Sequence, residues 1–142
     1  IVDGTYHREY QGQRIAFYLL GSDVMGYPYY LLSSSQILEN KKDGYYLFGG
    51  YIDGEYEDVE VDEKITDDSE KIKWLHFSDC MNNGGTSKLF IDFSPSEKGK
   101  KGQIVRYLHD PDEIKVIADS FDEYLGKLME YGLDFISEDT IY

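Results

Sequence analysis

"WLHFSDCMNNGGTSKLFIDFSP", residues 74–95, is the stretch that decides the fold. An apolar run at 74–77 is followed by a turn at 78–87, rich in asparagine and glycine, and by a second apolar run at 88–93. Asparagine and glycine tolerate the backbone conformations that tight turns require. The stretch therefore predicts a strand, a turn and an antiparallel return strand. The return strand carries an acid, Asp92, among its apolar residues, and its role needs an explanation.

Downstream of this hairpin, residues 95–102 are predicted to form a polar loop, and residues 103–109 and 114–118 to form two more strands. A C-terminal helix follows. Ser120 and Glu123 have the spacing of a capping box. The residues predicted to line the apolar face of this helix, which should end at Gly132, are Phe121, Leu125, Leu128 and Met129.

Upstream, residues 13–20 and 27–32 are predicted to be strands, and Pro28 indicates that the second is an edge strand or that Pro28 lies at its first residues. Residues 33–36, Ser-Ser-Ser-Gln, predict a capped start for a short helix. Residues 45–51, YYLFGGY, are aromatic enough to predict a strand, with the Gly-Gly pair marking a bulge or a close backbone approach.

The order of these elements, several antiparallel strands and then a C-terminal helix, predicts an α+β fold with a mainly antiparallel twisted sheet and helices packed on it. The 142 residues, 41% of them hydrophobic, suit one domain with a substantial core, residues 1–142. No apolar run approaches the roughly 20 residues of a membrane span. The single cysteine, Cys80, permits no internal disulfide and suits a reducing compartment, so a cytoplasmic location is expected.

The formal net charge is −14, from 28 acidic and 14 basic residues. Such a surface repels nucleic acid and anionic lipid and attracts basic partners, although solubility alone also accounts for it. Residues 53–70 hold ten acids and one base. Within them, 55–57 and 59–62 alternate as an exposed strand would, and 67–70 are predicted to be loop. The stretch is either a solvated loop or a contact surface for a basic partner.

The chain shows no nucleotide-binding loop of the Walker or Rossmann type and no nucleophile elbow. The best candidate metal ligands are His76, Asp79, Cys80 and His109, whose types suit zinc but whose spacing matches no established pattern. A surface or half-buried histidine explains His76 better. Cys80 as a nucleophile with His76 as its base is disfavoured, because nearby acids raise a thiol pKa. No catalytic, cofactor-binding or metal-binding residue is predicted.

Two roles are open for Asp92. It shares a strand face with Lys88 and Phe90, and there it could accept backbone N–H bonds from the turn at 82–85 and fix that turn. Alternatively, it could pair with Asp79 as a general acid and base. Nothing adjacent supplies a nucleophile or an oxyanion site, so the structural role is favoured.

Residues 74 to about 131 also resemble the core of the SUKH superfamily, which contains the yeast Smi/Knr cell-wall regulators and many bacterial immunity proteins. The resemblance is to a Trp-led strand, an Asp before a glycine-rich turn, an Asp-x-x-Pro strand end, a Gly-Gln hairpin, a His-Asp turn and a capped helix start. The matching residues are Trp74, Asp79, Gly84, Gly85, Asp92, Pro95, Gly102, Gln103, His109, Asp110, Ala118, Ser120 and Phe121. The family commonly has Pro where His76 stands, and its turn is usually shorter than 80–86. Its N-terminal Leu-Pro helix segment is not recognisable in residues 1–30 and lies upstream of Ile1 or is replaced here.

The resemblance implies that these residues are scaffold and that the fold is a binding module without catalytic residues. It implies an immunity-type protein that neutralises a toxin domain, often a nuclease; a regulatory or scaffolding module of the Smi/Knr kind is the alternative, and a small metal-dependent hydrolase a third. A basic toxin domain, rather than nucleic acid or membrane, is the expected partner. Ten of the 14 tyrosines precede residue 60, and they either pack the sheet or supply contact area. The candidate partner-binding residues are Tyr45, Tyr46, Tyr51, Glu55, Tyr56, Glu57, Asp58, Glu60 and Asp62.

Overall fold

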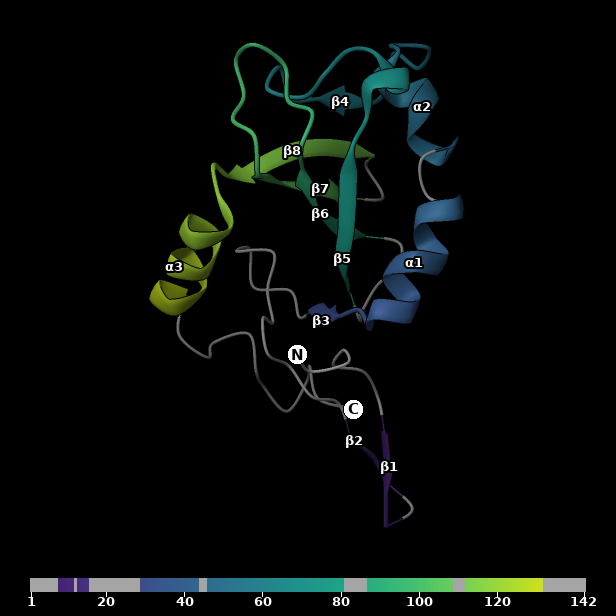
Figure 1. Ribbon diagram of the computed structural model, residues 1–142, viewed down its shortest axis with the longest axis vertical. Coiled ribbons are helices and arrows are strands. Elements are labelled where there is room, and N and C mark those ends of the chain that lie inside the picture. The colour runs from purple at the N-terminus through teal and green to yellow at the C-terminus, as the bar shows by residue number, and fades with distance from the viewer. Residues whose placement is uncertain are drawn as a thin grey trace.

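The centre of the molecule is a six-stranded sheet with the order β3-β5-β6-β7-β8-β4, seen in a computed structural model (Figure 1). The structure describes residues 8–11, 13–15, 29–43, 46–80, 87–108 and 112–131. Neighbouring strands are antiparallel except β4 and β8, which are parallel. The strands are β3 (Tyr29–Leu31), β4 (Glu60–Val61), β5 (Trp74–Cys80), β6 (Lys88–Asp92), β7 (Gln103–Leu108) and β8 (Glu113–Ala118). A separate antiparallel pair joins β1 (Arg8–Tyr10) to β2 (Gln13–Ile15).

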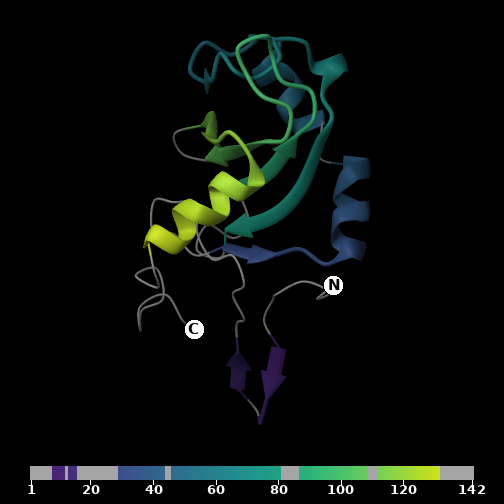
Figure 2. The same cartoon turned by 60° about the vertical axis from the view of Figure 1, so that its left-hand side comes forward.

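Helices cover both faces of the sheet (Figure 2). Helix α3 (Phe121–Tyr131) lies on one side, and α1 (Ser34–Asp43) and α2 (Tyr46–Ile52) lie on the other. The core under α3 includes Phe77, Leu89, Ile104, Tyr124 and Leu128. The core of the opposite face includes Ile52, Ile65, Trp74, Phe90, Val105 and Ile114. The α+β prediction, with a mainly antiparallel sheet and a C-terminal helix packed on it, is confirmed.

The hairpin that decided the prediction is present and longer than expected, because β5 runs through Cys80 instead of ending at Phe77. Its ladder contains a β-bulge: His76 pairs with Phe90 and Ser78 with Leu89, so Phe77 is the extra residue. A bulge reverses the alternation of side chains beyond it.

Three of the other predicted strands are present, and a fourth is described only in part. Strands β7 and β8 form within a residue of their predicted limits, and β3 is an edge strand, as Pro28 indicated. Of the strand predicted over 13–20, β2 covers Gln13–Ile15 and residues 16–20 lie outside the described residues.

The strand predicted over residues 45–51 is wrong, because Tyr46–Ile52 form helix α2. Strand propensity of aromatic residues is a weak preference that packing overrides. Here a helix buries Ile52, which is 4% exposed, and places the Gly-Gly pair against two neighbours. A Cβ at Gly50 would lie 2.8 Å from the Tyr56 ring, and one at Gly49 would lie 3.6 Å from Ser69 Cβ. Only Gly50 has a close neighbour, and the nearest described atoms at both glycines belong to side chains, so the predicted bulge or close backbone approach is not found among the described residues.

The strand predicted within 55–57 is also wrong, and only Glu60–Val61 of 59–62 form a strand. The loop predicted over 67–70 contains the start of a 3₁₀ turn, η1 (Ser69–Lys71). Asp68 caps it, because its Oδ1 accepts a hydrogen bond of 3.0 Å from the Glu70 N–H. Short polar side chains compete with strand pairing through such local bonds.

Both predicted helix caps are confirmed. Ser33 Oγ accepts from the Gln36 N–H at 3.2 Å, and Gln36 Oε1 accepts from the Ser33 N–H at 2.8 Å. At α3, Ser120 Oγ accepts from the Glu123 N–H at 3.0 Å. The predicted apolar face was wrong at one position: Met129 is 83% exposed, and Tyr124 is fully buried instead. With about 3.6 residues per turn, Met129 lies a quarter turn from the centre of the buried stripe.

Candidate partner-binding surface

Several acids of residues 53–70 serve the fold itself. Asp62 Oδ1 accepts from the Lys64 N–H at 3.0 Å and Oδ2 from the Val116 N–H at 3.1 Å, which ties β4 to β8. Asp53 accepts from Ser69 Oγ at 2.6 Å and from the Ser69 N–H at 2.9 Å. Both hydrogen bonds lower the pKa of Asp53, and the one from the Ser69 hydroxyl has the larger effect. Asp62, a candidate partner-binding residue, thus has both carboxylate oxygens engaged inside the protein.

Other acids of the stretch face solvent. Glu55, Glu57, Asp58 and Glu60 are exposed and form no ion pair within the part of the chain that the structure describes. Glu63 differs, because its Oε2 lies 2.9 Å from Lys98 Nζ. Four exposed carboxylates without a described ion-pair partner thus lie close together in the chain, between the end of α2 and β4.

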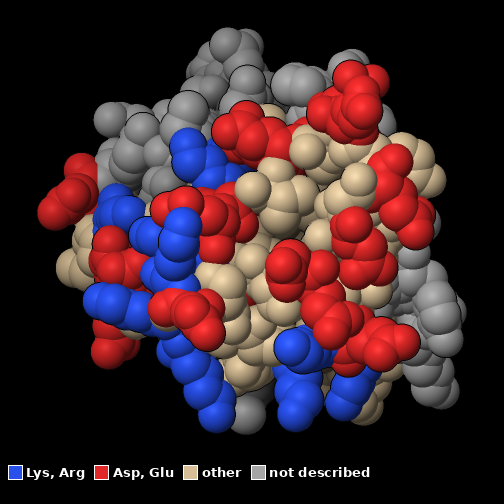
Figure 3. Space-filling model, turned by 90° about the horizontal axis from the view of Figure 1, so that it is seen from above, with Lys and Arg blue, Asp and Glu red and all other residues tan. Residues whose placement is uncertain are grey.

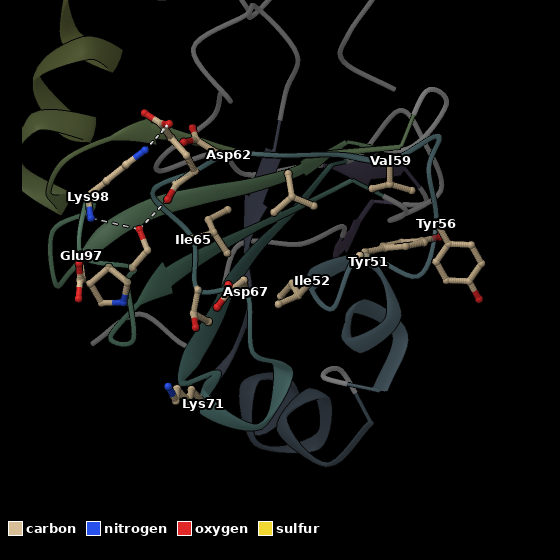
Figure 4. A pocket seen from close by; sticks show the side chains of 16 residues that line it. Tyr51, Ile52, Tyr56, Val59, Asp62, Ile65, Asp67, Lys71, Glu97 and Lys98 are labelled. Carbon is tan, nitrogen blue, oxygen red and sulfur yellow. Dashed lines mark hydrogen bonds and ion pairs between the residues drawn. The ribbon is translucent and has the colours of Figure 1, made fainter.

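A cavity of about 800 Å³ lies beside these acids, at the top of the molecule as drawn in Figure 1. Its apolar lining comes from Tyr51, Ile52, Val59, Val61 and Ile65. Figure 4 shows Tyr56 at one end of the cavity and Glu97 and Lys98 at the other, with Ile52 and Ile65 between them. In Figure 3, acidic side chains surround an uncharged centre on this face, while lysines gather along one margin.

The candidate tyrosines have different surroundings. Tyr56 is 55% exposed, and its ring meets the Tyr51 ring edge-on at 5.3 Å. Tyr51 is half-buried and donates to Asp112 Oδ2 at 2.9 Å, while Tyr107 donates to Oδ1 of the same carboxylate at 3.2 Å. The hydrogen bond to Asp112 and then burial raise the pKa of Tyr51. Tyr45 and the side chain of Tyr46 lie outside the described residues.

The wall formed by Pro95–Lys98 was not predicted from the sequence. Besides the Lys98–Glu63 ion pair, three contacts hold it against residues 63–65. Ser96 Oγ donates to the Glu63 carbonyl at 2.6 Å, the Ser96 N–H donates to the Lys64 carbonyl at 3.1 Å, and Ile65 forms a bridge with Pro95. These segments lie some thirty residues apart, and no local pattern signals their meeting. Asp112, which orients Tyr51, is missed for the same reason.

Asp92 has a structural role, but not the one predicted. It is fully buried; Oδ1 accepts from the Ser94 N–H at 2.7 Å and Oδ2 from Gln103 Nε2 at 2.9 Å. The prediction that Asp92 accepts from the turn at 82–85 is wrong, because Asp92 pairs with Trp74 at the opposite end of the hairpin. Gln103 in turn donates to the Lys64 carbonyl at 2.9 Å, so the acid connects the hairpin end to the acidic stretch.

Three other residues of the family pattern are placed by packing or by backbone conformation. Trp74 is 3% exposed with its ring 5.0 Å from Phe90, Gly102 has a φ of +91° that favours glycine, and Phe121 packs against Phe77 at 5.8 Å. Gly84, Gly85, His109 and Asp110 lie outside the described residues.

Of the candidate catalytic and metal residues that the structure describes, His76 and Asp79 meet, whereas Asp92 lies far from them, and His109 is outside the described residues. Asp79 pairs with Lys88 and Asp92 with Trp74, so about 13 Å of strand separates the two acids, which argues against an acid pair. His76 and Asp79 do meet, since the bulge puts them on one face: His76 Nε2 donates to Asp79 Oδ1 at 2.5 Å. Asn40 Nδ2 donates to His76 Nδ1 at 3.2 Å, and Lys88 Nζ lies 3.4 Å from Asp79 Oδ1. Cys80 belongs to the core under α3.

Among the described residues, no group of three or more His, Cys, Asp and Glu side chains is placed to hold a metal ion. Within the same residues, no helix has the length and apolar character needed to cross a membrane.

Comparison with known proteins extends the similarity well beyond the hairpin and the strands that follow it. A search among curated proteins finds no match. The model of the SMI1 / KNR4 family (SUKH-1) matches residues 5–127, which include the N-terminal segment where the sequence pattern was not recognisable. The match covers most of the 142 residues. The chain therefore belongs to the SMI1 / KNR4 family (SUKH-1), a family of immunity and protein-interaction modules.

Proposed function

We propose that this protein is a non-enzymatic, bacterial, cytoplasmic immunity-type protein that neutralises a basic toxin domain, foremost a nuclease, by covering it with its acidic surface. The observation that carries the proposal is the 800 Å³ cavity with an apolar lining and exposed, unpaired carboxylates beside it. Family membership supports a protein-interaction role at a coarser level.

The charge pattern suits a nuclease as the partner. A nuclease grips phosphate with Lys and Arg, and an acidic protein can occupy the same surface. Complementary charge mainly accelerates association and excludes wrong partners. A net charge of −14 would attract a basic domain, and the four exposed carboxylates beside the cavity would favour its approach there.

The apolar cavity would add binding affinity, which complementary charge mainly does not provide. Strong interfaces depend on a few anchors that fill desolvated pockets, and tyrosine is prominent among such residues. Tyr56 stands exposed at the end of the cavity with its ring against Tyr51, and Tyr51 is held by Asp112. Tyr51 and Asp112 thus act as supports, and Tyr56 is the residue placed to contact the partner.

The test is a pull-down from the source organism, followed by an assay of the purified partner. In the bait variant, Glu57, Asp58 and Glu60 are each replaced by Lys. Asp62 is left intact because its Oδ2 accepts a hydrogen bond from the Val116 N–H of β8. The matched control carries Glu39, Asp122 and Glu130 as Lys, three exposed acids on α1 and α3, and has the same net charge.

The proposal expects the native chain and the control to recover one basic protein whose toxic activity stops when an equal amount of native chain is added. The variant at residues 57–60 should recover much less of it. Equal recovery by all three baits would indicate that the interface lies outside the acidic stretch. A recovered partner without toxic activity, or several weak partners, would favour the regulatory alternative instead.

A further inference from the structure

A second cavity, of about 400 Å³, lies on the α1 side of the sheet and has a different chemistry. Its apolar lining comes from Ile37, Ile72, Trp74, Leu75, Phe90 and Phe93. This volume falls within the range of pockets that hold small molecules, which are typically apolar with a few placed polar groups. Phe93, at 45% exposed, leaves apolar surface open to solvent at this site.

The charged residues that line this cavity are basic, whereas the net charge of the molecule is negative. Lys41 and Lys73 line the cavity and no acid does, in a chain with a net charge of −14. The larger cavity is lined by four acids and two lysines. Both Lys41 and Lys73 are exposed, and neither forms an ion pair with any described residue. Two uncompensated cations beside an apolar cavity favour a ligand with an apolar body and an anionic end.

The walls of this cavity are held by contacts that do not depend on a ligand. Asn40 bonds to His76, which fixes α1 over β5, and the His76 ring lies 5.0 Å from the Phe90 ring. The Lys73 N–H donates to Ser94 Oγ at 2.7 Å, and the Phe93 N–H donates to the Lys73 carbonyl at 2.8 Å. Lys73 and Phe93, a cation and an exposed aromatic ring, are therefore kept side by side.

We propose that the cavity between α1 and strands β5 and β6 is a binding site for a small monocarboxylate with an aromatic or medium-chain aliphatic body. The body would lie against Ile37, Leu75 and Phe93, above the buried rings of Trp74 and Phe90, and the carboxylate would face Lys41 and Lys73. This site is separate from the acidic cavity and does not rest on the toxin-binding proposal.

The test uses Trp74, the single tryptophan of the chain, as its own reporter. The full chain is titrated with 3-phenylpropionate and with decanoate, and tryptophan emission and heat are measured. The matched ligands are 3-phenylpropanamide, which is neutral, and 3-phenylpropylamine, which is cationic. The variant has Lys41→Gln and Lys73→Gln. The control has Lys101→Gln and Lys115→Gln, two exposed lysines that form no ion pair within the described chain.

Saturable binding of the carboxylates with a change in Trp74 emission is expected. The amide should bind about tenfold more weakly, a difference of about 1.4 kcal/mol, and the amine more weakly still. The variant should reduce carboxylate affinity to the level of the amide, while the control keeps it. Absence of saturable binding, equal affinity for acid and amide, or equal losses in variant and control would each overturn the proposal. The Glu57, Asp58 and Glu60 variant should retain carboxylate binding, so the two proposals fail independently.

Discussion

At the scale of single residues, buried polar side chains have specific partners that join distant segments. Asp92 and Gln103, both fully buried, are bonded to each other and to backbone groups of Ser94, Lys100 and Lys64. A buried carboxylate is tolerated only when such donors surround it. A strand acid can thus be explained by scaffold chemistry alone, without a catalytic role.

Replacing Asp92 with Ala should lower the free energy of unfolding by about 2–4 kcal/mol, because the Ser94 and Gln103 donors lose a buried acceptor. Urea denaturation measures the change. The control is Asp122→Ala, an exposed acid on α3, which should change stability by less than about 0.5 kcal/mol. Equal effects of the two substitutions would contradict the structural role of Asp92.

The two tyrosines that share Asp112 predict a loss of stability in alkali. Burial and then the Asp112 charge raise the pKa of Tyr107 above its ordinary value of 10.0. A group with a raised folded-state pKa contributes stability that is present below its unfolded value and is lost as pH rises through its folded value. The free energy of unfolding should therefore fall as pH rises above about 10. Tyr107→Phe should flatten this fall in urea titrations at several pH values, and an unchanged slope would contradict the assignment.

At the scale of elements, glycine positions show which backbones meet. Gly99, in the loop that forms one wall of the larger cavity, has no room for a side chain: a Cβ would overlap the Lys64 carbonyl oxygen and lie 2.7 Å from Gln103 Oε1. Gly126, inside α3, has nothing within 4 Å of the same position. Gly99 is therefore required by packing, whereas Gly126 only weakens helix α3.

Gly99→Ala should therefore destabilise the protein by about 2 kcal/mol, since backbone has to move. Gly126→Ala should stabilise it by about 0.5–1 kcal/mol through helix propensity. Thermal or urea unfolding of both variants gives the comparison. A stable Gly99→Ala variant would mean that the 95–102 loop does not lie against residue 64.

At the scale of the whole molecule, uncompensated negative charge opposes the compact state. The net charge of −14 should make the thermal midpoint rise with salt, because screening weakens this repulsion. The variant with Glu57, Asp58 and Glu60 as Lys changes the net charge by +6, to −8, and should show a smaller rise. Calorimetry across a sodium chloride series measures both. The same rise in the two proteins would indicate that salt acts in another way.

The local parts of the fold were predictable because they depend on neighbouring residues. The hairpin of β5 and β6, the edge position of β3 and the two serine caps follow from turn residues, Pro28 and side-chain-to-backbone bonds within four positions. The acidic stretch was also located from the sequence, which left open whether Tyr56 packs the sheet or is exposed. Tyr51 shows the limit, because its support by Asp112 joins residues 61 positions apart.

By itself, the sequence determined the α+β class, the hairpin, the capped helices and the place along the chain where negative charge collects, since periodicity, turn chemistry and charge are local properties. The tertiary structure alone decided that residues 46–52 are a helix, which donors surround Asp92, and that Pro95–Lys98 close a cavity beside the acids. It also placed Lys41 of α1 and Lys73, which directly precedes β5, on one apolar cavity. These features depend on contacts between segments distant in sequence, and such contacts form only where burial and hydrogen bonding across the whole fold favour them.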